Sequence, residues 1–371
     1  MKTQSPPADI LRSGPPGQPG HKAVANWIMI GVAMLLIQVV LGGITRLTGS
    51  GLSITEWNVV TGALPPLNEG AWMKEFQKYQ QTPQYYYLNS DFTLRDFKFI
   101  FFWEWFHRLW ARLIGVVFLV GFVYLLAKKY LKKEMFGPLF FLFLFGAFQG
   151  AIGWIMVASG LTGDAVYVKP TKLAMHFVFA LGLISCAYWY ALDLKVTKLN
   201  AIGNPPIRKF TIWLIVLVFV QLIFGALMAG HKAAIAAPTW PTINGSMIPS
   251  GMMRETPAIL NFVENKMTIH FIHRGLAYLL LVLIIVYSLK LFKIKTDSAV
   301  FNKARKFPLI FVLVQVLLGI LSLLTAPSII PNHWGTFEWM AQLHQVTGML
   351  LTLSLVAMLY LIRKNDPVQL A

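Results

Sequence analysis

Long runs of apolar residues alternate with short basic loops along the whole chain. Eight runs are each about 20 residues long, which is the length that an α-helix needs to cross a bilayer, and they are continuous rather than alternating as in membrane β-strands. They cover residues 25–44, 106–127, 137–158, 173–193, 210–230, 268–289, 307–326 and 340–362. The pattern predicts an all-α polytopic membrane protein with eight transmembrane helices.

Lys and Arg residues are distributed unequally over the loops between these runs. With the N-terminus in the cytoplasm, the inner segments hold 19 of the 32 Lys and Arg residues, and the short inner loops are strongly basic. Short cytoplasmic loops of membrane proteins carry such an excess. We therefore expect both termini inside, with two long outer loops at residues 45–105 and 231–267.

Two tails and a linker complete the predicted organisation. Residues 1–24 are rich in Pro and Gly and contain no apolar signal-peptide region, so we expect a disordered cytoplasmic tail rather than a cleaved signal. A second tail covers 363–371. Two four-helix halves, 25–193 and 210–362, are joined by a cytoplasmic linker at 194–209.

The first outer loop contains aromatic residues at helical spacing, namely Trp72, Phe76 and Tyr79, with charged residues between them. This spacing predicts a short amphipathic helix. The helix either lies on the membrane surface or packs on the protein.

Composition agrees with a membrane protein. Charged residues make up 13% of the chain and hydrophobic residues 56%, whereas a soluble globular protein carries about 25% charged residues. The net charge of +17 reflects basic cytoplasmic loops, and we expect no nucleic-acid binding. The single cysteine, Cys186, excludes an internal disulfide, a Cys-based zinc site and a covalent CxxCH haem attachment within this chain. A metal would have to be bound mainly by His, Met or carboxylates.

Two short patterns recur in step along the chain. Each odd-numbered run contains Gln-x-x-x-Gly, and each even-numbered run carries one His near its outer end. These are Gln38–Gly42, Gln149–Gly153, Gln221–Gly225 and Gln315–Gly319, with His107, His176, His273 and His344. Gln and Gly four residues apart share a helical face, so the simplest interpretation is close helix packing with the Gln amide bonded to a neighbouring helix. The recurrence indicates a duplication with two parallel halves.

The four histidines are the strongest functional candidates. All lie within about two helical turns of the outer surface, and ionisable residues inside a membrane are functional candidates by default. Two imidazoles that face each other across a helix bundle suit noncovalent haem iron. His107 with His176, and His273 with His344, therefore predict one haem site in each half. Copper binding, a proton relay and a purely structural role are the alternatives.

Arginines and one glutamate accompany the histidines. Arg46, Arg108, Arg112 and Arg274 lie near the outer ends of the runs, where they can pair with haem propionates or extend to the membrane interface. Glu104 shares a helical face with His107, and no carboxylate stands at the equivalent place before His273. The two halves are therefore chemically unequal. Glu104 can bond an axial His, transfer protons or simply be solvated at the interface.

A set of short motifs extends over most of the chain, from about residue 27 to 362. The motifs are Gly42-Gly43-Ile44-Thr45-Arg46-Leu47-Thr48, Ser50-Gly51-Leu52-Ser53, Glu56-Trp57, Pro65-Pro66, Glu104-Trp105-Phe106-His107-Arg108, Thr239-Trp240-Pro241, His273-Arg274 and His344-Gln345. With these motifs the chain resembles haem A synthases of the mitochondrial and proteobacterial type. The cysteine pair that another type of the family carries in the first outer loop is missing, and Lys172 is the nearest basic residue where the family often has Arg before the fourth-run His.

The resemblance implies an oxidoreductase that converts the C8 methyl group of haem O to the formyl group of haem A for terminal oxidases. It implies that His273 and His344 bind a haem b cofactor, and that His107 and His176 bind the substrate haem. It makes haem O synthase and oxidase assembly factors candidate partners besides membrane lipid. It places the chain in a bacterial cytoplasmic membrane, with the mitochondrial inner membrane as the alternative.

The residues alone leave other functions open. A di-haem cytochrome b that oxidises quinol fits two haem sites equally well. A transporter with His-lined sites is a third class, but transporters often have inverted repeats, whereas halves with an even number of helices are parallel.

The topology can be tested with reporter fusions. A reporter fused after Lys133 or Lys306 should read as cytoplasmic, and one inserted within 231–267 should read as external, because the basic residues concentrate in the short inner loops. An external reading after Lys306 would overturn the orientation and the predicted depth of the histidines.

Overall fold

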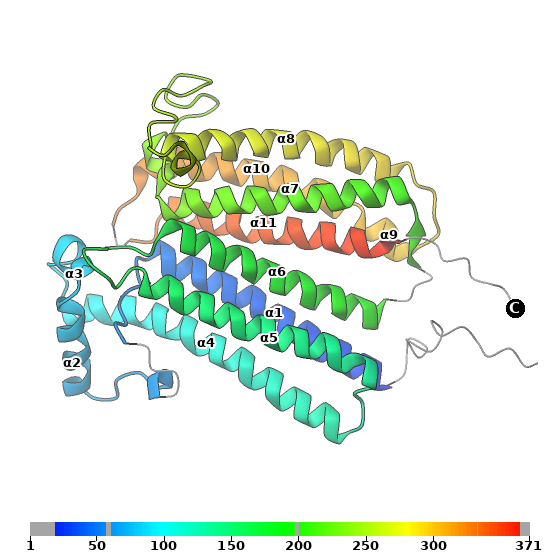
Figure 1. Cartoon of the computed structure of the whole chain (residues 1–371), viewed down its shortest axis with the longest axis horizontal. Helices are drawn as coiled ribbons and strands as arrows, with labels where there is room; N and C mark the ends of the chain where they lie inside the picture. The colour runs from blue at the N-terminus through cyan, green and yellow to red at the C-terminus, as the bar shows by residue number, and fades with distance from the viewer. Residues whose placement is uncertain (1–18, 57–60, 197–199, 332, 364–371) are drawn as a thin grey trace, which may run out of the picture.

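The computed structural model describes residues 19–56, 61–196, 200–331 and 333–363. Within these residues, eight helices are long and apolar enough to cross a membrane, which confirms the eight predicted runs. They are α1 (Pro19–Leu47), α4 (Leu94–Ala127), α5 (Lys133–Ala158), α6 (Pro170–Lys195), α7 (Pro205–Gly230), α8 (Lys266–Phe292), α10 (Phe307–Thr325) and α11 (Thr336–Leu361) (Figure 1).

Shorter elements occupy the loops. At the end that the sequence predicts to be outer they are η1 (Thr61–Ala63), α2 (Glu69–Gln80), α3 (Pro83–Leu88), η3 (Ala233–Ala236), η4 (Ala258–Phe262) and η5 (Ala326–Ser328). At the other end of the bundle are β1 (Ile202–Gly203), α9 (Ala299–Ala304) and β2 (Ile362–Arg363).

Several helix ends extend beyond the apolar runs because polar residues cap them. Helix α4 begins at Leu94, 12 residues before the predicted apolar run. Thr93 caps this end, because its side chain and that of Asp96 form a reciprocal capping box. The α1 helix begins at Pro19, so residues 19–24, which we expected in the tail, are helical. His21 and Val24 are buried there, which explains why the helix continues past its apolar run. The rest of the predicted N-terminal tail, 1–18, lies outside the described residues.

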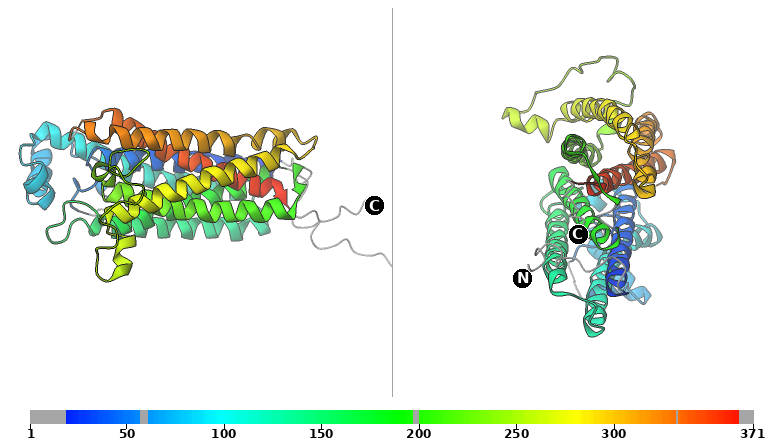
Figure 2. Two further views of the ribbon diagram at one scale, coloured as in Figure 1. Left: turned by 90° about the horizontal axis from the view of Figure 1, so that it is seen from above. Right: turned by 90° about the vertical axis from the view of Figure 1, so that its right-hand side faces the viewer.

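The eight long helices form two groups of four (Figures 1 and 2). The N-terminal half contains α1, α4, α5 and α6, and the C-terminal half contains α7, α8, α10 and α11. The halves meet where α1 and α6 pack against α7 and α11. This contact makes α11 the most deeply buried of the eight spans.

Two glutamines of α11, in the C-terminal half, form hydrogen bonds with α1 of the N-terminal half. The Nε2 atoms of Gln342 and Gln345 donate to the carbonyls of Val40 and Val39, at 3.1 and 2.9 Å. Both glutamines also lie against Gly43, where an added Cβ would be 2.8 Å from Gln345 Nε2. Because no side chain fits at this position, glycine allows the close approach of α1 and α11.

The chain's last described residues bind the linker between the halves. Ile202 of β1 pairs in parallel with Ile362 of β2. The guanidinium of Arg208 donates to the carbonyls of Leu359 and Ile362, at 3.0 and 2.8 Å. These bonds fix the inner ends of α7 and α11 to each other.

The short helix predicted in the first outer loop is α2, and it packs on the protein rather than lying free. The rings of Phe76 and Tyr79 stack on Phe97 of α4, with centroids 5.1 and 5.3 Å apart. Burial raises the pKa of Tyr79 to about 12, so the phenol stays neutral. It donates to Gln84 at 3.1 Å and accepts from Asn89 at 2.7 Å.

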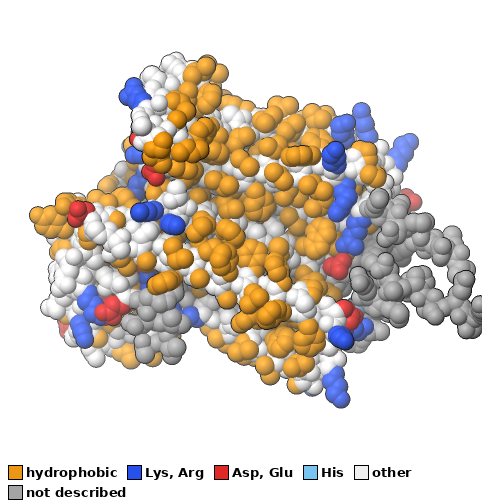
Figure 3. Space-filling view, viewed as in Figure 1, with side chains coloured by type: hydrophobic (Ala, Val, Ile, Leu, Met, Phe, Trp, Pro, Cys, Tyr) orange, Lys and Arg blue, Asp and Glu red, His pale blue; other side chains and the backbone are white. Residues whose placement is uncertain are grey.

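Apolar side chains cover the middle of the bundle surface, whereas many Lys and Arg residues gather at the end that carries β1, β2 and α9 (Figure 3). The exposed residues of α4 and α5 include Leu119, Val120, Phe140 and Phe143. On the face seen in Figure 3, an apolar band between charged ends is the surface expected for contact with lipid chains. Which end faces the cytoplasm stays a prediction.

Candidate functional site

The Gln-x-x-x-Gly pattern and the histidines contact each other within each pair of successive long helices. In three of the four pairs, the Gln amide donates to the backbone carbonyl of the His. These bonds are Gln38 to His107 at 3.2 Å, Gln149 to His176 at 2.9 Å and Gln221 to His273 at 3.0 Å. In the fourth pair, His344 Nδ1 lies 3.0 Å from the Gln315 carbonyl, and the Gln315 amide lies 3.3 Å from His344 Nε2.

The glycine of each pattern faces the imidazole ring. An added Cβ would lie 3.2 Å from His107 Nε2 at Gly42, and 2.9, 3.1 and 2.9 Å from the Cε1 atoms of His176, His273 and His344 at the other three positions. A side chain there would displace the ring, because real Cβ atoms rarely come so close. The interpretation of close packing through Gly is therefore confirmed, and the group that is packed is the histidine itself.

The C-terminal histidines face one another across their half. The ring centroids of His273 and His344 are 6.5 Å apart, and the planes are inclined at 79°. Two imidazoles that each bind one metal ion at about 2 Å have ring centres about 6 Å apart. His273 Nδ1 is buried without a hydrogen-bond partner among the described residues. The geometry and the unpaired nitrogen fit a pair of axial ligands.

The N-terminal histidines are His107 on α4 and His176 on α6, and they are close enough for their charges to interact. They present different edges to their glycines, Nε2 for His107 and Cε1 for His176. His176 Nδ1 also lies 3.0 Å from the Gln149 amide. The two pairs are therefore built on the same contact but are not equivalent in detail.

In the described part of the chain, no group of three or more His, Cys, Asp or Glu side chains could hold a metal ion. A haem supplies four of its own nitrogen ligands, so two imidazoles are sufficient for its iron.

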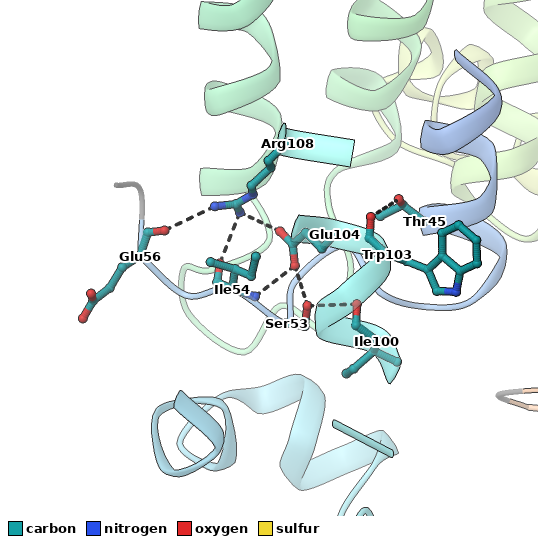
Figure 4. Close-up of polar contacts among 8 residues, drawn as sticks. All are labelled: Thr45, Ser53, Ile54, Glu56, Ile100, Trp103, Glu104 and Arg108. Carbon is teal, nitrogen blue, oxygen red and sulfur yellow. Dashed lines mark hydrogen bonds and ion pairs between the residues drawn. The ribbon is translucent and has the colours of Figure 1, made fainter. Parts of the chain in front are cut away.

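Glu104 is buried and fully hydrogen-bonded (Figure 4). Its Oε2 accepts from Ser53 Oγ at 2.7 Å and from the backbone N–H of Ile54 at 2.9 Å. Its Oε1 pairs with Arg108 at 2.6 Å. The carboxylate is thus not a solvated interfacial group, and its described partners belong to the first outer loop and to Arg108 rather than to His107.

Arg108 holds the same loop from the other side of Glu104. Its guanidinium donates to the carbonyls of Ile54 and Glu56, both at 3.2 Å (Figure 4). Together with Glu104 it attaches residues 53–56 to the outer end of α4. Most of its hydrogen-bonding capacity is therefore directed to the protein.

The second half has an equivalent attachment. Arg274, which follows His273 as Arg108 follows His107, donates to the carbonyls of Ala237, Thr239 and Thr242 at 2.9, 2.9 and 3.2 Å. His270 takes the place of Glu104, and its Nε2 lies 2.9 Å from the Ala233 carbonyl. In both halves, the outer loop is held by the residue three positions before the histidine and by the residue directly after it.

Arg46 and Arg112 have different surroundings. Among the described residues Arg46 forms no hydrogen bond or ion pair, and the opposite charge that acts on it is Glu338 at the start of α11. Arg112 has an interaction partner. Of these two arginines, Arg46 therefore retains donors for an anionic group.

Comparison with known proteins places the chain in a family. The family model described as cytochrome oxidase assembly protein, COX15-CtaA, matches residues 25–357. The chain belongs to this family.

Three curated relatives of the family are each named heme A synthase. The protein from Paracoccus denitrificans is 40% identical over 333 residues, covering 87% of both chains. That from Parvibaculum lavamentivorans is 43% identical over 71% of this chain and 76% of the relative. That from Methylorubrum populi is 38% identical over 94% and 89%.

Several residues near the candidate site were not predicted from the sequence. One is Ser53, which belongs to the Ser-Gly-Leu-Ser motif and donates a hydrogen bond to Glu104. Two others are Gln342 and Gln345, which lie on either side of His344. Their spacing around the histidine was a signal, but the carbonyls of α1 that they bind become visible only in the folded chain.

The attachment by Arg274 can be tested by limited proteolysis. Arg274→Ala removes the donor to three carbonyls, so the outer loop should open more often and proteinase K should cleave within 231–267 about tenfold faster. Arg254→Ala, an exposed arginine of the same loop, is the matched control and should not change the rate. Equal rates for Arg274→Ala and the unmodified protein would show that other contacts hold the loop.

Proposed function

We propose that this protein is a haem A synthase of a bacterial cytoplasmic membrane, which oxidises the C8 methyl group of haem O to the formyl group of haem A for terminal oxidases. Family membership and the names of the relatives support the activity. The bacterial source of those relatives and the eight apolar helices support the location. The proposed division of roles rests on the differences between two histidine pairs that are otherwise built alike.

His273 and His344 are the proposed ligands of a resident haem b. Their ring separation of 6.5 Å fits two axial imidazoles on one iron. When bound, haem b supplies one-electron transfer to the reaction. The chain's own contribution is to fix both rings, through Gly225 and Gly319, at the depth where the ligands meet.

His107 and His176 are the proposed ligands of the substrate haem O and of the product haem A. Arg46 is the best placed of the four arginines for the propionates, since it forms no hydrogen bond or ion pair among the described residues, whereas Arg108 and Arg274 hold the outer loops. Arg112 is a further proposed contact. Each propionate is a carboxylate that a guanidinium can bind through two parallel hydrogen bonds. These contacts would orient the ring so that one edge is held at the outer end of the bundle.

Glu104 is the proposed group for proton transfer beside the substrate. Conversion of a methyl to a formyl group must remove protons as well as electrons, and a positioned carboxylate can accept a proton. Three donors hold the Glu104 carboxylate, so it is well oriented. The same donors give it a second role as an anchor of residues 53–56.

The activity and the division of roles can be tested together in cells that also make haem O. The unmodified protein should yield haem A in extracts analysed by chromatography. His273→Ala or His344→Ala should lose the low-spin haem b spectrum, because each removes one of two axial ligands. His107→Ala or His176→Ala should lose haem A while haem b remains.

Two results would contradict this assignment. An unmodified protein that forms no haem A and shows only quinol-reducible haem B would instead be a di-haem cytochrome b. Retention of the full haem b spectrum in both C-terminal variants would show that these histidines are structural.

Glu104→Gln tests proton transfer when it is compared with a variant that weakens the anchor alone. Gln keeps the size of the side chain and its Oε1 can still accept from Ser53 and Ile54, but the amide cannot accept a proton at neutral pH and loses the ion pair with Arg108. We expect haem A formation to fall by about a hundredfold or to stop at a hydroxylated intermediate, with haem b retained.

Ser53→Ala is the matched control, because it removes a donor to the same carboxylate and leaves the acid intact. It should keep most of the activity and its pH profile. If Ser53→Ala lowers haem A formation as much as Glu104→Gln does, the carboxylate acts as an anchor and not in proton transfer.

A further inference from the structure

The second outer loop, 231–267, contains a long stretch without any charged residue. None of the residues 233–253 is Lys, Arg, Asp or Glu. In a soluble protein, about a quarter of the residues in such a stretch would be charged. The stretch includes the Thr239-Trp240-Pro241 motif, to which the proposed function assigns no role. Its composition indicates that an apolar medium rather than water surrounds part of this loop.

Several large apolar side chains of the loop are exposed. Met247 and Ile248 are 71% and 68% exposed, and Trp240 is 45% exposed. Met253 and Ile259, further along the loop, are exposed as well. A single exposed apolar residue is normal on a protein surface, but a group of them within one loop indicates a surface that contacts a partner or a membrane.

Hydrogen bonds hold the base of the loop, so the exposed side chains have defined positions. Ile243 and Ser246 exchange two backbone hydrogen bonds, at 2.8 and 3.2 Å, around a tight turn. Asn244 of this turn donates through its side chain to the Ala236 carbonyl at 2.9 Å. Arg274 of α8 donates to three further carbonyls of the loop. A surface that is ordered before it binds loses less entropy on binding.

A hydrogen bond to α8 places Trp240 below the outer end of the membrane span. The apolar core of a bilayer needs about 20 residues of helix, and counting outward from Lys290 at the other end of α8 this length reaches His270. Tyr278 lies eight residues further in, which is about 12 Å at 1.5 Å per residue. Its hydroxyl accepts from Trp240 Nε1 at 3.1 Å. Although helical side chains lean toward the N-terminus, here the outer end, the indole stays inside this boundary.

The loop extends sideways from the bundle. It stands out from α8 across the axis of the long helices in Figure 1, and it projects away from the bundle in the view along the helices in Figure 2. In Figure 3, apolar side chains of this loop adjoin the apolar band of the bundle. Val282, one turn after Tyr278 on the same face of α8, is also exposed. The apolar surface of the loop is therefore continuous with a side of α8 that faces lipid.

We propose that residues 240–253 form a membrane anchor that inserts into the headgroup region of the adjacent lipid leaflet. Trp240 lies where headgroups meet acyl chains, the level at which amphipathic Trp and Tyr side chains collect. Met247 and Ile248 insert beside it. Because Arg274 joins the loop to α8, the anchor fixes the outer end of that helix relative to the membrane surface. The proposal does not depend on the activity of the protein.

An apolar surface of a partner protein is the competing occupant. Interfaces between proteins usually surround an apolar centre with a polar rim that includes charged residues. Residues 233–253 supply no charge for such a rim. The depth of Trp240 along α8, and the continuity of the loop with the lipid-facing side of this helix, favour the membrane.

The experiment measures the surroundings of single fluorescent labels on the purified full-length protein, with one copy in each lipid nanodisc. Cys186→Ala removes the single native thiol. Ile248→Cys then carries the environment-sensitive fluorophore NBD at the proposed anchor. Glu255→Cys carries it at the matched control position, which is exposed in the same loop but holds a charged residue. Nanodiscs are made with and without lipids that carry a doxyl quencher near the headgroup.

The label at Ile248→Cys should emit at shorter wavelength than the label at Glu255→Cys. Doxyl lipids should quench it at least about twofold more strongly, because an interfacial segment lies about 5–10 Å into the boundary between headgroups and acyl chains. Equal emission and quenching at the two positions would overturn the anchor. A blue-shifted label that doxyl lipids do not quench would overturn it too, because the side chain would then be covered by protein. A label that is exposed to water in nanodiscs but shielded in native membrane vesicles would show a partner protein in place of lipid.

Discussion

The structure depends on one recurring contact, in which a glutamine of one long helix binds the histidine residue of the next long helix. A Gln amide inside a bilayer has no water to bond, so it must find an acceptor in the protein. In three helix pairs this acceptor is the His carbonyl, and in the fourth it is the ring itself. The bond fixes the depth of one helix relative to the next, and the glycine one turn later gives the imidazole its space. Helix register and ligand position are therefore set by the same short pattern.

The outer loops are connected to this framework through the same helices. In one half Glu104 and Arg108 hold residues 53–56, and in the other His270 and Arg274 hold residues 233–242. Each pair stands just before and just after a proposed ligand. A shift of that helix would move the loop and the histidine together. The arginines thus have a structural function in addition to any contact with propionates.

Much of the framework could be predicted from the sequence because it depends on local patterns. Hydropathy located the eight helices, and the recurring Gln, Gly and His residues indicated the two matched halves. Other features depend on contacts between distant residues and have no local signal. The packing of Phe76 on Phe97 and the bond from Ser53 to Glu104 are of this kind. The start of α1 at Pro19 was missed for a related reason, since burial of His21 stabilises a turn that hydropathy alone does not favour.

Gly42 and Gly43 are neighbours in α1, yet they belong to different halves of the molecule. The first gives space to His107, and the second gives space to Gln342 and Gln345, which flank His344. Two halves with separate tasks can usually diverge independently. Here one dipeptide serves both halves, so a shift of α1 at this point would move the space of His107 and the space of the two glutamines together. The two halves can specialise over most of their length, but at this point they are bound to evolve together.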